Sequence, residues 1–123
     1  MSKKRILIVD DEEEIVMAVQ ARLEANDYEV MAAFDGIQAL EKASKLKPDL
    51  ILLDVNIPVM GGFEIAKRLK ASADTGPIPF IFVTAKGDEE AMLEGIGLGA
   101  VSYIIKPFTP EQLLGEIKRA LQK

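Results

Sequence analysis

Leu50-Ile51-Leu52-Leu53-Asp54 is a run of four apolar residues that ends in a carboxylate. The run has the length of a β-strand, and because it is apolar throughout, we expect both faces of that strand to be covered. Strands of this kind are typical of parallel sheets with helices on both sides. Four more runs have this character, the last of them more weakly: 6–9, 80–83, 101–105 and 28–34.

Segments of helical period separate these runs. Apolar residues recur at helical spacing over 12–25, 36–46, 62–73, 88–98 and 110–121. The last segment is the clearest, and 88–98 is the weakest because Gly95 and Gly97, inside it, should each cost about 1 kcal/mol relative to alanine. The alternation predicts one α/β domain over residues 1–123, with a doubly wound five-stranded parallel sheet and helices on both faces.

Composition narrows the class of protein. The chain has 123 residues, a net charge of −5, and neither cysteine nor histidine. These absences exclude disulfides, thiol catalysis, Cys/His zinc sites and a Ser-His-Asp triad. The acidic balance argues against direct nucleic-acid contact. No apolar run reaches the roughly 18 to 20 residues of a membrane span. We therefore expect a cytoplasmic protein without membrane insertion.

Polar residues follow four of the five apolar runs. Asp10 and Asp11 follow the first along the chain, Asp54 the third, Thr84 the fourth and Lys106 the fifth. Ligands of open parallel sheets bind beyond the carboxyl ends of the strands, so these side chains should meet in one crevice. Three carboxylates repel one another unless a cation intervenes, and Mg²⁺, with Mn²⁺ as an alternative, suits such ligands.

A lysine and a hydroxyl beside such an ion are suited to phosphoryl oxygens. The set therefore predicts phosphoryl transfer, with the Asp54 carboxylate as nucleophile. Each residue alone has a simpler interpretation. Asp10 or Asp11 could cap the following helix, and Asp54 could be a turn residue. Thr84 could bond its own backbone, and Lys106 could form a surface ion pair. Five polar groups at one edge of an apolar sheet favour a site.

Four segments together resemble the receiver domain of bacterial two-component response regulators. They are Ile6-Leu7-Ile8-Val9-Asp10-Asp11-Glu12, Leu53-Asp54-Val55-Asn56-Ile57-Pro58-Val59-Met60-Gly61-Gly62, Val83-Thr84-Ala85 and Tyr103-Ile104-Ile105-Lys106-Pro107-Phe108. The resemblance covers essentially the whole chain. It implies a flavodoxin-like fold with strand order 2-1-3-4-5.

The resemblance also implies a function. Asp54 would accept a phosphoryl group from a histidine kinase or a histidine phosphotransfer protein. Mg²⁺ would be bound by Asp11, Asp54 and the backbone carbonyl of Asn56, with Asp10 acting mainly through water. The domain would not be an enzyme but a signalling module that catalyses its own phosphorylation and dephosphorylation.

Further roles follow from the same resemblance. Lys106 would pair with the phosphoryl group, and Thr84 would bond it and move inward on activation. Tyr103 would then swing from exposed to buried, and the fourth helix, fifth strand and fifth helix would bind a downstream protein. The chain ends at Lys123, just after the last predicted helix. We therefore expect no output domain in this chain. It would be either a stand-alone regulator or a receiver cut from a longer protein. We expect a monomer, with dimerisation on phosphorylation left open.

Two other functions share parts of this pattern. A Mg²⁺-dependent phosphatase of the haloacid-dehalogenase type also uses an aspartate nucleophile, but it needs an acid two residues later, where this chain has Asn56. A flavin-binding electron carrier of the same fold needs a phosphate-cradling loop after the first strand. The acidic residues 10–14 would repel a phosphate there.

Overall fold

The structure, a computed structural model, describes residues 3–122. Strands and helices alternate along the chain, as the sequence predicts. Their bounds are β1 (Arg5–Val9), α1 (Glu13–Glu24), β2 (Glu29–Ala33), α2 (Gly36–Leu46), β3 (Leu50–Leu53), α3 (Gly62–Ala71), β4 (Phe80–Thr84), α4 (Glu89–Gly97), β5 (Ser102–Ile105) and α5 (Pro110–Leu121). The strands form one parallel sheet in the order β2-β1-β3-β4-β5, which confirms the predicted topology.

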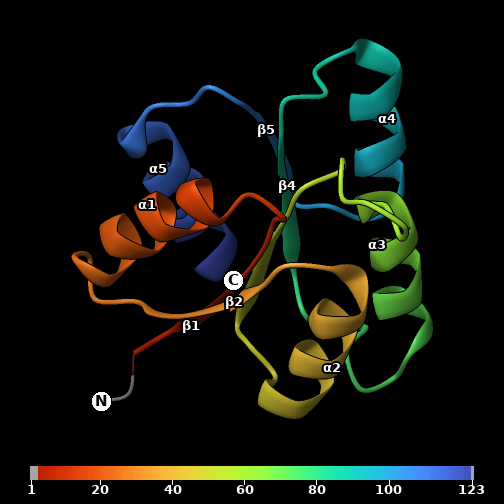
Figure 1. Cartoon of the computed structure of the whole chain (residues 1–123), viewed down its shortest axis with the longest axis horizontal. Coiled ribbons are helices and arrows are strands. Elements are labelled where there is room, and N and C mark those ends of the chain that lie inside the picture. Colours follow the sequence, from red (N-terminus) through yellow and green to blue (C-terminus); the bar gives the residue numbers. More distant parts are fainter. Residues whose placement is uncertain (1–2, 123) are drawn as a thin grey trace.

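The sheet lies between two layers of helices. Figure 1 shows α1 and α5 on one face and α2, α3 and α4 on the other. Alternate residues of each central strand serve the two layers, because successive side chains of a strand point to opposite faces. In β1, Leu7 and Val9 pack with the three-helix layer, and Ile6 and Ile8 with α1 and α5. This two-sided burial explains why the central strands are apolar throughout.

The strand register brings the polar strand ends together. Val9 is paired with Leu53, so the residues that follow them, Asp10 and Asp54, emerge side by side. Thr84 is paired with Ile105, the residue before Lys106. The predicted convergence at the carboxyl edge of the sheet is therefore confirmed for these four residues.

Two helix bounds were predicted to the residue, and both of these helices begin at a capping side chain. The bounds of α2 and α5 match the predictions, and both begin at a side-chain cap: Asp35 accepts the N–H of Gln38, and Thr109 that of Gln112. By contrast, α3 ends at Ala71, before the predicted residue 73, because Ser72 adopts an extended conformation. Within residues 3–122, no helix combines the length and the apolar character that crossing a bilayer requires.

Candidate functional site

Two buried carboxylates form the floor of the site. Asp10 directly follows β1 and Asp54 directly follows β3, and their residues are 3% and 5% exposed. Each turns its Oδ1 back to the chain: Asp10 accepts the N–H of Glu12 and Asp54 that of Asn56, both at 3.0 Å. These local bonds fix the orientation of both carboxylates and leave both Oδ2 atoms for other partners.

The Lys106 ammonium joins the two carboxylates. Its Nζ lies 2.7 Å from Asp10 Oδ2 and 3.1 Å from Asp54 Oδ2, and the lysine side chain is 13% exposed. The Lys106 N–H donates to the carbonyl of Thr84 at 2.8 Å, which extends the pairing of β4 with β5 to the site. The alternative of a surface ion pair for Lys106 is therefore wrong. The peptide bond from Lys106 to Pro107 is cis.

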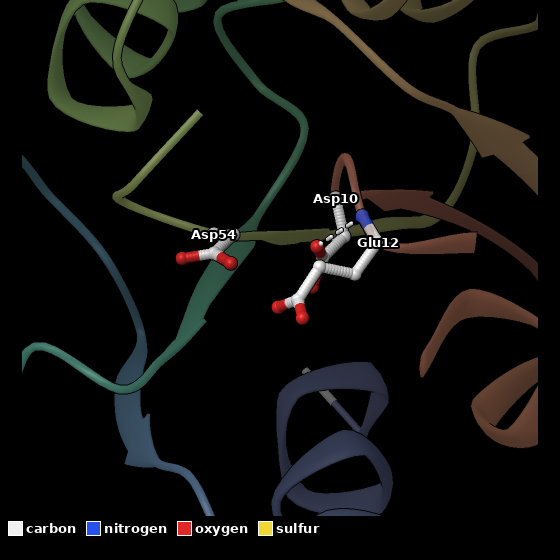
Figure 2. Close-up of side chains that lie close together, drawn as sticks. All are labelled: Asp10, Glu12 and Asp54. Carbon is white, nitrogen blue, oxygen red and sulfur yellow. Dashed lines mark hydrogen bonds between the residues drawn. The ribbon is translucent and has the colours of Figure 1, made fainter. Parts of the chain in front are cut away.

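Glu12 is the third carboxylate of the cluster, in the place where the sequence predicted Asp11. Carboxylate oxygens of Asp10, Glu12 and Asp54 all lie within 4.8 Å of one another. Figure 2 shows Asp10 and Glu12 on the segment after β1 and Asp54 beside them at the end of β3. Glu12 Oε1 is also 3.9 Å from Lys106 Nζ. The acidic stretch at 12–14 is the signal that could have pointed to Glu12, but it also suits a helix N-terminus.

Asp11 does not join this cluster. It is exposed, because Asp10 points into the site and the next side chain turns toward solvent. Neither aspartate caps α1: Glu12 occupies the N-cap position and makes no side-chain cap bond, so the capping alternative is wrong. The role of Asp11 as a metal ligand stays a prediction, as does that of the exposed Asn56.

Burial and charge shift the pKa values of the central ion pair in the same direction. Burial raises the pKa of Asp10, and the Asp54 charge adds to this, while the Lys106 hydrogen bond and the N–H of Glu12 oppose it. Burial alone would lower the pKa of Lys106, but the hydrogen bond to Asp10 and the negative charges of Asp54 and Asp10 outweigh it and raise that pKa. The ammonium is thus held charged among the acids.

Thr84 and Tyr103 contact the same segment beyond β4. Thr84 is fully buried, and its Oγ1 accepts the N–H of Lys86 at 3.2 Å. Tyr103, from β5, donates its hydroxyl to the carbonyl of Lys86 at 2.5 Å. The Tyr103 ring is half-buried, 5.8 Å between centroids from the ring of Phe82. Both predicted switch residues are therefore attached to one residue of the β4–α4 connection.

The backbone of Gly62 lies in close contact with the backbone of Asp54. A Cβ placed on Gly62, the first residue of α3, would lie 2.1 Å from the carbonyl oxygen of Asp54. The N–H of Gly62 also donates to the carbonyl of Val55 at 2.8 Å. Only glycine allows the start of α3 to approach the chain this closely, and this approach fixes the backbone that carries the central carboxylate.

The fold and the arrangement of this site agree with a known family. The family model described as the response regulator receiver domain matches residues 6–118. The chain belongs to the response regulator receiver family. Receiver domains are signalling modules of two-component systems, so the resemblance inferred from the four sequence segments is confirmed at the level of the family.

Both curated relatives and solved structures match this receiver domain. It is 43% identical over 120 residues to the alkaline phosphatase synthesis transcriptional regulatory protein PhoP of Bacillus subtilis, which covers 98% of this chain and 49% of that protein. It is also 43% identical to the phosphate regulon transcriptional regulatory protein PhoB of Pseudomonas aeruginosa, over 100% of this chain and 54% of PhoB. The receiver domain thus spans about half the length of these relatives.

Among solved structures, the chemotaxis protein CheY4 of Vibrio cholerae superposes with a TM-score of 0.91 at 38% identity, over 98% of this chain and 100% of that one. A putative response regulator from Chloroflexus aurantiacus gives a TM-score of 0.94 at 33% identity, over 99% of this chain and 100% of that one. These matches agree with the observed flavodoxin-like strand order.

Proposed function

We propose that this receiver domain accepts a phosphoryl group on Asp54 from a phosphohistidine of a histidine kinase or phosphotransfer protein in the cytoplasm. The observation that carries the proposal is the bridging of Asp54 and Asp10 by the Lys106 ammonium in a buried site. An Asp54 oxygen would form the new P–O bond while the P–N bond breaks, and the imidazole nitrogen would keep the electron pair of that bond. Lys106 would pair with the incoming phosphoryl oxygens.

The donor set suits a hard divalent ion. The clustered oxygens of Asp10, Glu12 and Asp54 come without histidine or cysteine, which fits Mg²⁺ or Mn²⁺ and not zinc. We propose Asp11, Asp54 and the carbonyl of Asn56 as ligands, with Asp10 acting through water. When bound, the ion supplies positive charge that neutralises the acids and the phosphoryl oxygens.

An apolar surface beside the site could bind a phosphodonor protein. A hollow of about 590 Å³ lies between α1 and the segment after β5, and its apolar lining includes Ile15, Val19, Pro107 and Phe108. Lys106 lines the same hollow and contacts Asp54. A phosphohistidine of a protein bound in the hollow would therefore lie near the Asp54 carboxylate. This geometry favours a macromolecular donor over a small phosphomonoester.

The output would be carried by the α4–β5–α5 surface, formed by those three elements. Four of its apolar side chains are exposed: Leu93 and Ile96 of α4, Ile105 of β5 and Val101 just before β5. Thr84 and Tyr103 reach this surface through Lys86, so a change at Asp54 has a physical route to it. A downstream protein is the proposed occupant, and dimerisation on phosphorylation remains the alternative occupant to test.

Phosphorylation with a small phosphodonor tests the acceptor. Incubation with acetyl phosphate and Mg²⁺ should add the mass of one phosphoryl group, and Asp54→Asn should abolish the addition, while the control Asp49→Asn, on the opposite edge of the sheet, should not. A label that persists in Asp54→Asn would refute the assignment. Asp11→Ala should weaken Mg²⁺ binding. Sustained turnover of phosphomonoesters would instead favour the haloacid-dehalogenase type of phosphatase.

A further inference from the structure

Gly95 occupies a position in α4 where a side chain would collide with two aromatic rings. The residue is buried in the second half of the helix. A Cβ there would lie 2.9 Å from Cδ2 and 3.0 Å from Cε2 of Tyr103, and 3.0 Å from Cδ2 of Phe82. A Cβ contact under 3.0 Å essentially never occurs in folded proteins and one at 3.0 Å is unusually tight, so the space of the missing side chain is taken by the rings.

Of the two rings, only Tyr103 is free to move away. Phe82 is fully buried, and its ring packs edge-to-face against Phe63 at 5.2 Å and Phe80 at 5.5 Å between centroids. Tyr103 is half-buried and lies on β5, an edge strand of the sheet. An added methyl group at Gly95 would therefore displace the Tyr103 ring toward solvent.

The position of the Tyr103 ring has a consequence for the segment beyond β4. Side chains hold both backbone polar groups of Lys86: its N–H donates to Thr84 Oγ1, and its carbonyl accepts the hydroxyl of Tyr103. If the Thr84 hydroxyl turns to a phosphoryl group on Asp54, the Tyr103 hydroxyl becomes the remaining side-chain partner of Lys86. That bond requires the ring to lie in the space above Gly95.

We propose that Gly95 is a positioning residue for Tyr103, and that its missing side chain is what lets the Tyr103 ring couple the Lys86 segment to the α4–β5–α5 surface. The coupling to phosphorylation rests on the proposed function, but the placement of the ring does not. Helix propensity alone would favour alanine here, so the glycine is explained by the ring and not by the helix.

Gly97 provides a matched control in the same helix. A Cβ placed on it meets nothing within 4 Å. The chain has no tryptophan and two tyrosines, so in a Tyr28→Phe background the fluorescence reports on Tyr103 alone. Acrylamide should quench this fluorescence more strongly in Gly95→Ala than in the background protein or in Gly97→Ala. Equal quenching in all three proteins would overturn the proposal.

A double-mutant cycle keeps the test decisive if Gly95→Ala folds poorly. Gly97→Ala, at the last residue of α4, should raise the folding equilibrium constant by up to about fivefold, which is the gain of alanine over glycine in a helix interior. Gly95→Ala should lack this gain when Tyr103 is present and recover part of it in a Tyr103→Ala background, where Phe82 Cδ2 at 3.0 Å is the remaining close contact. A loss of stability that is the same with and without the ring would overturn the proposal.

Phosphorylation assays separate this inference from the proposed function. Asp54 should be phosphorylated to the same extent in the reference protein, Gly95→Ala and Gly97→Ala. Beryllofluoride, a phosphoryl mimic, should change hydrogen exchange over residues 87–103 in the reference protein and Gly97→Ala, but not in Gly95→Ala. An unchanged response in Gly95→Ala would refute the coupling. A reference protein that is never phosphorylated would refute the proposed function, while the quenching experiment would still decide the placement of Tyr103.

Discussion

Replacing Lys106 by methionine tests how the acidic site is held together. The substitution keeps an apolar stem of similar length but removes the ammonium between Asp10 and Asp54. Carboxylate oxygens of these two acids lie within 4.8 Å. At that separation and an effective dielectric constant of about 20, their mutual repulsion is about 3 kcal/mol. Removal of one partner from a buried ion pair has a similar cost, so we expect Lys106→Met to lower the free energy of unfolding by about 3 kcal/mol at pH 7.

Urea denaturation in EDTA measures this loss, with the exposed Lys67→Met as the control. The loss should shrink on acidification: without Lys106 the pKa of Asp10, already raised, rises further, and protonation of the acid in the folded state relieves the repulsion. In the parent protein the raised pKa of Lys106 keeps the ion-pair contribution intact below the ordinary lysine pKa of 10.5, and it is lost as the pH rises through the folded-state value. A loss below about 1 kcal/mol, or one independent of pH, would refute this account.

Mg²⁺ should stabilise Lys106→Met more than the parent protein, because no ammonium competes for the acids; thermal unfolding with and without the ion measures the two increments, and equal increments would contradict the competition. Gly62→Ala should cost about 3 kcal/mol or more, since the new Cβ would meet the Asp54 carbonyl at 2.1 Å, whereas in Gly61→Ala the nearest atom is at 3.5 Å and urea denaturation should show little change. Val59→Gly should stabilise the fold by up to about 1 kcal/mol, because this fully exposed β-branched residue has a φ of 72°. Val59→Ala should recover less, and an equal gain in both variants would show that the left-handed backbone is not the cause.

The order of strands and helices was predictable because each element carries its own local signal. The bounds of α2 and α5 follow from an amphipathic pattern that begins at a capping residue, Asp35 or Thr109. The segment of α4 gave a weak signal because its two glycines oppose a helix. The structure explains one of them: Gly95 is required by the packing of Tyr103, which no local pattern reveals.

Which residues form the site was only partly predictable, because their contacts are not local in the sequence. Asp10, Asp54, Thr84 and Lys106 could be assigned because each ends an apolar strand. The contacts between them depend on strand register, which could not be read from the sequence because strands that are apolar on both faces show no alternation. In the turn after β1, Glu12 and not Asp11 joins Asp10 and Asp54 in the cluster. Side-chain direction in the turn after β1 is a tertiary property, so the two neighbouring acids could not be told apart beforehand.

The bond between Lys106 and Asp10 joins residues that are 96 positions apart in the chain, and the bond between Lys106 and Asp54 joins residues 52 apart. During synthesis, Asp10 and Asp54 leave the ribosome long before Lys106 does. A nascent or proteolytically clipped chain that ends before Lys106 therefore lacks the ammonium that joins Asp10 and Asp54. Under the proposed function, a chain cut before Lys106 should therefore accept phosphoryl groups poorly and should not compete for them with a chain that contains β5 and Lys106.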